Sequence, residues 1–218
     1  GQEVYRIKNK NIYKTYIQTS RSYTSPSKGN LGWKEVPMPK IIQTRPSSNE
    51  DVSSEKYQKN DYLIAARTGY FNQAKNHGIL KLYSEGGHEI SSEEIRQIPD
   101  LDPTLVKAIC IQESHAALTS SDIMTSNNPG DWGDGKLKSA YGMKKKEKMS
   151  VTNSLYYGIR ILATKGFKGG VKYDKKTGET SYEFKGWGNA TNNFNGGGVR
   201  NYQNDVETMV RESKPRKR

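Results

Sequence analysis

Apolar residues recur at helical spacing mainly in the second half of this chain of 218 residues. From about residue 89 to residue 210, segments with apolar positions three or four apart alternate with loops rich in glycine and asparagine. This pattern predicts a mainly α domain of the α+β class, which spans residues 61–218 and has its core at about 89–212.

The best-defined predicted element is a helix over Thr104–His115. It follows Asp102-Pro103, a favourable helix start, because aspartate accepts a backbone N–H and proline has none to leave unpaired. The apolar residues that follow form one stripe at helical spacing, namely Leu105, Val106, Ile109 and Cys110.

Two more helices and a hairpin are predicted around it. Asp61–Ala74 has the pattern of a short amphipathic helix capped by Asp61. The segment after Ser150 carries an apolar stripe to which we assign packing, made of Val151, Leu155, Tyr156, Ile159 and Leu162. Val171–Phe184 alternates around a turn and predicts a β-hairpin, placed to edge a cleft.

The first 60 residues differ from the rest in composition. They are rich in lysine, asparagine, serine, threonine and tyrosine, and scattered aromatic and β-branched residues in Glu3–Gln18 predict short strands. Gln43–Gln58 has the composition of a linker. We therefore expect residues 1–60 to be an irregular, extended or loosely structured segment without chemistry of its own.

Composition narrows the function classes. Cys110 is the single cysteine and the three histidines show no paired metal-ligand spacing, so neither an internal disulfide nor a zinc centre is expected. No apolar run is long enough to cross a bilayer, and no signal peptide is visible. The net charge of +12 favours binding to an anionic partner, which could be nucleic acid, a membrane surface or a cell-wall polymer.

Glu113 is the candidate for acid chemistry. Leu105 and Ile109 are four residues apart, and the next step of four reaches Glu113. A carboxyl group beside apolar neighbours loses solvation of its charged form, so its pKa rises, as a general acid near neutral pH requires. By spacing alone, a glutamate that is partly exposed or paired with a basic residue is the more common alternative.

Four segments between residues 105 and 202 resemble, in order and approximate spacing, motifs of soluble lytic transglycosylases and goose-type lysozymes. The first, Leu105–Ser114, is similar to the helix that ends in a catalytic Glu followed by Ser, and the second, Asp122–Trp132, is similar to the Gly-Leu-Met-Gln stretch and its Asn-rich loop. The third, Asn153–Ala163, is similar to the helix behind the cleft, and the fourth, Asn189–Tyr202, is similar to the late Ala-x-x-Tyr-Asn-x-Gly motif. The resemblance implies a lysozyme-like fold without a cofactor. It also implies that Glu113 is the acid that cleaves the peptidoglycan bond between N-acetylmuramic acid and N-acetylglucosamine.

Two departures from the family pattern bear on the reaction. Thr125 stands where the family has glutamine, and Phe194 stands where it has tyrosine. Lytic transglycosylases use that glutamine and tyrosine near the reacting sugar, so the departures favour a hydrolytic muramidase, with a lytic transglycosylase as the alternative.

A second carboxylate is expected because glycoside hydrolysis normally uses two. Asp122 follows Glu113 at a separation resembling the Glu–Asp pair of phage-type lysozymes, which implies that it orients water or stabilises positive charge on the sugar. The alternative is a loop aspartate that bonds its own backbone. Asp131 and Asp134 are weaker candidates, since both lie in a turn-forming sequence.

A glycan cleft also needs flat apolar faces for sugar rings and polar groups for their edges. Aromatic residues more often belong to a core than to a binding surface, so each of them has that alternative role. The expected substrate-binding residues are Ser114, Asn127, Asn128, Trp132, Tyr141, Phe194, Asn195 and Tyr202, with Trp187 as a further candidate face and Ser114 fixing the cleft backbone.

Peptidoglycan is the expected partner, and nucleic acid is not, because the positive charge is dispersed and no nucleic-acid-binding motif is present. The alternative is a basic module that binds peptidoglycan or nucleic acid without catalysis. A muramidase without a visible signal suits secretion or delivery to the periplasm or cell wall, as an antibacterial toxin or a phage-type lysin. In the toxin case an immunity protein is an expected partner.

Overall fold

The computed structural model describes residues 2–8, 11–17, 34–127 and 134–216, and its mainly helical architecture confirms the predicted α+β class. The helices are α1 Asp61–Asn76, α2 Ser92–Arg96, α3 Pro103–Ser114, α4 Gly135–Ala140, α5 Val151–Lys165, α6 Trp187–Phe194 and α7 Tyr202–Arg211, with a 3₁₀ helix η1 at Glu55–Gln58. Within the described ranges no helix combines the length and apolarity needed to span a membrane.

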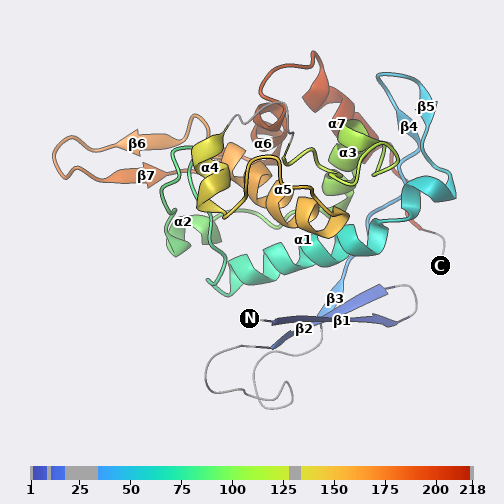
Figure 1. Cartoon of the computed structure of the whole chain (residues 1–218), viewed down its shortest axis with the longest axis horizontal. Helices are drawn as coiled ribbons and strands as arrows, with labels where there is room; N and C mark the ends of the chain where they lie inside the picture. Colours follow the sequence, from blue (N-terminus) through green and yellow to red (C-terminus); the bar gives the residue numbers. More distant parts are fainter. Residues whose placement is uncertain (1, 9–10, 18–33, 128–133, 217–218) are drawn as a thin grey trace.

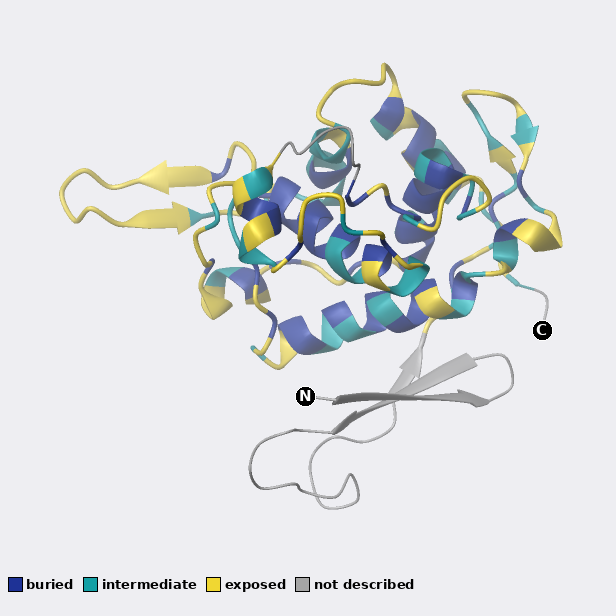
Figure 2. Ribbon diagram, viewed as in Figure 1, coloured by how far each residue is buried: buried dark blue, intermediate teal, exposed yellow. Residues whose placement is uncertain are grey.

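Helix α3 lies in the middle of the helical domain, packed against α1 on one side and α7 on the other (Figure 1). Helix α5 packs against α1 and α6. In Figure 2 these central helices are mostly buried, and in α3 the apolar residues Val106, Ala108, Ile109 and Ile111 are inaccessible to solvent. A central helix of this kind holds any residue at its end in a fixed place.

The predicted boundaries of the central helices are confirmed. Asp102 caps α3 by accepting the Thr104 backbone N–H at 2.8 Å, and Ser150 caps α5 by accepting that of Asn153 at 3.2 Å. The predicted hairpin is also present, with β6 (Val171–Tyr173) antiparallel to β7 (Thr180–Tyr182). It projects away from the helices at one end of the domain (Figure 1).

The short strands predicted within Glu3–Gln18 are confirmed as well. β1 (Gln2–Lys8), β2 (Asn11–Ile17) and β3 (Lys34–Val36) form an antiparallel sheet in the order β1-β2-β3. This sheet lies beside α1 in Figure 1. The N-terminal part is therefore more regular than its composition suggests.

The linker predicted at Gln43–Gln58 is wrong. These residues form a short hairpin, β4 (Thr44–Arg45) with β5 (Glu50–Asp51), followed by η1. Val52 and Tyr57 are buried in the main core, and Arg45 contacts the side chains of Gln112 and His115 around the end of α3. Two buried apolar residues and a polar contact are enough to hold a polar segment against the domain.

The predicted cap of α1 is also wrong. Asp61 is the first helical residue and is buried, and the preceding Asn60 makes no side-chain cap. The Asp61 carboxylate instead accepts from the Lys107 ammonium at 2.9 Å and from Arg216. This buried charge cluster joins α1 and α3 to the C-terminal segment.

Candidate active site

Glu113 occupies the last turn of α3, one residue before the buried Ser114. The three residues that follow the helix, His115, Ala116 and Ala117, all have positive φ, between 51° and 74°. For residues with a Cβ this conformation costs roughly 1–2 kcal/mol each, and such strain concentrates at functional sites. The chain therefore leaves the helix sharply after Glu113.

Tyr202 is the direct partner of Glu113. Its hydroxyl, at the start of α7, donates a 2.5 Å hydrogen bond to Glu113 Oε1, and its ring is buried in the core. From the sequence, Phe194 replaces the family's tyrosine and Tyr202 is an expected substrate-binding residue. In the structure Tyr202, eight residues after Phe194, is buried and supplies a hydroxyl to the candidate acid.

The surroundings of Glu113 favour its neutral form. Burial raises the pKa of this carboxyl above its usual range, and the negative charge of Asp122 adds to the effect. Hydrogen bonds from Tyr202 and Thr125 act in the opposite direction without cancelling it. Glu113 therefore holds its proton to a higher pH than an exposed glutamate, as a general acid requires.

The loop 122–127 is fixed between α3 and α5. Ser114 Oγ donates to the Ile123 carbonyl at 2.8 Å, and the Met124 N–H donates to Ser154 Oγ at 3.0 Å. Gly158 allows this close approach, because a Cβ there would lie 2.7 Å from Met124. Ser114 is thus fully buried and fixes the backbone, as expected, and it has no surface for contact with a ligand.

Asp122 organises the same loop. Its Oδ1 accepts from Ser126 N and Oγ, both at 2.8 Å, and from Ser154 Oγ at 2.5 Å, while Oδ2 accepts from Asn127 N at 2.8 Å. Oδ1 is therefore fully engaged, and Oδ2 retains room for one more donor. The carboxylate lies near enough to Glu113 to act on its pKa.

Glu113 opens onto a pocket of about 320 Å³. Thr125 and Ser126 line one part of it, and α6 contributes Phe194 with Asn195 just after it. Phe194 and Asn195, both predicted from the sequence, therefore lie on the same pocket as Glu113. The combination of carboxyl groups, a ring, hydroxyls and an amide is suited to a sugar, which has apolar faces and polar edges.

The pocket also contains an ion pair that sequence reasoning missed. Lys165, at the end of α5, contacts Asp134 Oδ2 and Glu85 Oε1, each at 2.8 Å. Asp134, a weaker candidate for the second carboxylate, thus lines the Glu113 pocket but is neutralised by Lys165. No local sequence pattern indicates this role of Lys165, because its partners Asp134 and Glu85 lie 31 and 80 residues earlier in the chain.

Three other predicted residues have structural partners instead. Asn127 is buried and donates to the Lys144 and Glu147 carbonyls, at 3.1 and 2.9 Å. Tyr141 contacts Thr164 Oγ1 through its hydroxyl, and burial raises its pKa to about 12. Trp187 donates to the Pro99 carbonyl and packs on aromatic rings of the core. Asn128, Asp131 and Trp132 lie outside the described residues.

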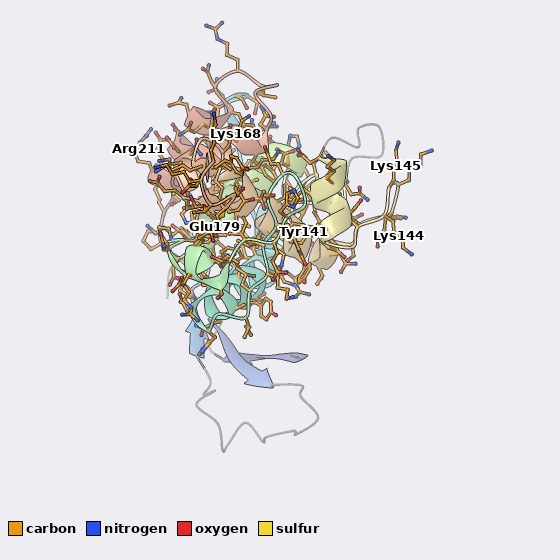
Figure 3. The ribbon with its side chains drawn as sticks, turned by 90° about the vertical axis from the view of Figure 1, so that its left-hand side faces the viewer. Tyr141, Lys144, Lys145, Lys168, Glu179 and Arg211 are labelled. Atoms are coloured by element: carbon orange, nitrogen blue, oxygen red, sulfur yellow. The ribbon has the colours of Figure 1, made fainter. Side chains whose placement is uncertain are left out.

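A basic loop follows α4. Lys144, Lys145, Lys146 and Lys148 are exposed, and Lys144 and Lys145 point away from the domain in Figure 3. Asn127 holds this loop beside the segment that carries Asp122, which places several positive charges near the candidate site. In the part of the chain that the structure describes, no group of three acidic, histidine or cysteine side chains is placed to hold a metal ion.

Comparison of the chain with protein-family models, with curated proteins and with solved structures finds no match. The assignment of a function therefore depends on the motifs of the sequence and on the geometry around Glu113.

The Tyr202→Phe variant tests the contact with Glu113. Because the Tyr202 hydroxyl donates to the carboxylate and stabilises its charged form, its removal should raise the pKa of Glu113 further. The measurement is a ¹³C NMR titration of the glutamate carboxyl groups. The matched control, Tyr173→Phe on the exposed hairpin, should leave the Glu113 titration unchanged. An unchanged or lowered pKa in Tyr202→Phe would contradict the assignment of this hydrogen bond.

Proposed function

We propose that this protein cleaves the glycan strands of peptidoglycan at the β-1,4 bond between N-acetylmuramic acid and N-acetylglucosamine. The observation that carries the proposal is the environment of the Glu113 carboxyl, whose pKa is raised by burial. This carboxyl accepts a hydrogen bond from Tyr202 and lines an open pocket. The order of motifs that resemble lytic transglycosylases and goose-type lysozymes supports the same acid.

The proposed reaction begins with proton transfer from Glu113 to the glycosidic oxygen. The bond from that oxygen to C1 of the muramic sugar breaks, and positive charge develops on its ring. An oxygen nucleophile then attacks C1 and gives its proton back to the Glu113 carboxylate. The hydrogen bond from Tyr202 stabilises this carboxylate while it is charged.

The nucleophile is either water or the 6-hydroxyl of the muramic sugar. Hydrolysis normally uses a second carboxylate, for which Asp122 offers the remaining acceptor position of Oδ2. The other oxygen, Oδ1, accepts hydrogen bonds from Ser126 and Ser154, so this half of the Asp122 carboxylate holds the 122–127 loop in place. Attack by the 6-hydroxyl needs Glu113 alone, so the engaged state of Asp122 favours a lytic transglycosylase as the second candidate.

Mass spectrometry of digested peptidoglycan sacculi tests the proposal. Hydrolysis should release fragments with reducing muramic ends, and transglycosylation should release fragments with 1,6-anhydromuramic ends. Glycan strands that remain intact while the protein still binds the sacculi would overturn catalysis and indicate a wall-binding module. Delivery to the periplasm or cell wall, and an immunity protein as partner, remain predictions from the sequence.

A further inference from the structure

A second pocket lies at the base of the β6–β7 hairpin. It measures about 280 Å³ and is bounded by the turn 84–88, the end of α5 and the hairpin itself. Phe167 and Tyr182 provide its apolar wall, and their rings meet edge to face with centroids 6.2 Å apart. Thr164 and Thr180 add hydroxyl groups, and Glu85 adds a carboxylate.

One face of the hairpin continues this pocket. Val171 pairs with Tyr182 and Tyr173 pairs with Thr180, so these four side chains lie on the same face. Val171 is 53% exposed and Tyr173 is 64% exposed. The opposite face carries Lys172 and Ser181. The hairpin projects from the domain and is largely exposed (Figures 1 and 2). The side chains of Val171, Tyr173 and Tyr182 thus form an apolar strip that runs from the pocket into solvent.

The base of the hairpin is held firmly. The Tyr182 N–H donates to Glu94 Oε1 at 2.7 Å, and the same glutamate closes the capping box of α2 with Ser91. The Glu183 N–H donates to the Gly170 carbonyl at 2.9 Å, and a Cβ at Gly170 would collide with the Glu183 carbonyl. The strip is therefore presented by a fixed base, which lowers the entropic cost of binding.

Lys165 connects the two pockets. It lines the Glu113 pocket, where it contacts Asp134, and its ammonium also contacts Glu85 of the hairpin pocket. The two pockets are therefore neighbours, with the buried Lys165 ion pairs between them. The hairpin comes towards the viewer in Figure 3, with Glu179 at its turn.

We infer that the hairpin pocket and the strip Val171–Tyr173 bind further N-acetylated sugars of the glycan strand held at Glu113. The inference rests on the proposed function. Each hexosamine has an apolar ring face and acetyl methyl group that pack on aromatic and aliphatic side chains, and hydroxyl and amide groups that pair with threonine hydroxyls and a carboxylate. This combination is what the pocket and strip present.

The test uses the Val171→Thr/Tyr173→Thr variant in a Glu113→Gln background, so that the probe is not digested. Both side chains are exposed, and threonine preserves the strand. The probes are glycan strands stripped of their peptides and, separately, free stem peptides. The variant should bind the stripped strands about tenfold more weakly than the Glu113→Gln parent, which corresponds to about 1.4 kcal/mol.

The control changes the opposite face, as Lys172→Thr/Ser181→Thr, and should bind the strands like the parent. Equal weakening by the control and the test variant, unchanged binding by the test variant, no binding by the parent, or binding of the stem peptides alone would each overturn the inference. Cleavage of sacculi by the wild-type protein is scored separately. A cleaving enzyme whose hairpin variant binds normally refutes the hairpin site and leaves the proposed function standing.

Discussion

The Glu113→Gln variant is expected to lose peptidoglycan cleavage by about 10²- to 10⁴-fold, the contribution typical of a positioned general acid. Glutamine keeps the size of the side chain and an oxygen that accepts from Tyr202, but it has no proton to transfer to the glycosidic oxygen. The measurement is the rate of soluble fragment release from sacculi. Glu93→Gln, an exposed glutamate on α2, is the matched control and should cleave at the wild-type rate.

Unfolding experiments separate this loss from misfolding. Because the pKa of Glu113 is raised in the folded protein, the folded chain binds more protons than the unfolded chain above the ordinary pKa of glutamate. The free energy of unfolding therefore falls as pH rises through the folded pKa. Glu113→Gln removes this dependence, so its melting temperature at neutral pH should equal or exceed that of the wild type. An active variant, or an inactive one that is destabilised, would contradict the assignment of Glu113.

The sequence predicted the position of Glu113 because the signals involved are local. The cap Asp102, the proline after it and the apolar stripe all lie within α3 and act through neighbouring turns. The same holds for the Ser150 cap of α5 and for the β6–β7 turn. Such elements need no knowledge of what packs against them.

The partners of Glu113 could not be predicted in the same way. Tyr202 lies 89 residues further along the chain, and nothing around it distinguishes a hydroxyl that meets a carboxyl from one that meets solvent. The spacing between Glu113 and Asp122 predicted a catalytic pair, but it did not predict the four hydrogen bonds that Asp122 accepts. These bonds come from Ser126, Asn127 and Ser154. These contacts are tertiary, so local pattern carries no information about them.

The structure of segment 43–58 also depends on tertiary contacts that its sequence does not predict. Its composition is that of a linker, yet Tyr57 donates to Glu50, and Glu50 lies 3.4 Å from the His115 ring at the end of α3. Burial of one tyrosine and pairing with a distant helix decide its structure. A polar composition therefore excludes a large core of its own, but not attachment to the core of the neighbouring domain.

The Asp61→Ala variant is expected to lower the free energy of unfolding by about 3–5 kcal/mol, the usual cost of breaking a buried ion pair. Lys107, in the middle of α3, is fully buried, and its ammonium donates to Asp61 Oδ2 at 2.9 Å, to the Lys40 carbonyl at 3.3 Å and to Gln58. Without Asp61, the ammonium keeps only neutral partners. The measurement is urea unfolding followed by circular dichroism.

The pH dependence of this loss has a definite sign. Burial lowers the pKa of Lys107 in the folded protein, so above neutrality the folded variant binds fewer protons than the unfolded chain, and its stability should rise with pH. The control Glu89→Ala removes only the exposed pair with Lys81 and should cost less than about 1 kcal/mol. If Asp61→Ala costs no more than this control, Gln58 and the Lys40 carbonyl suffice to hold the ammonium, and the buried cluster does not join α1 to α3.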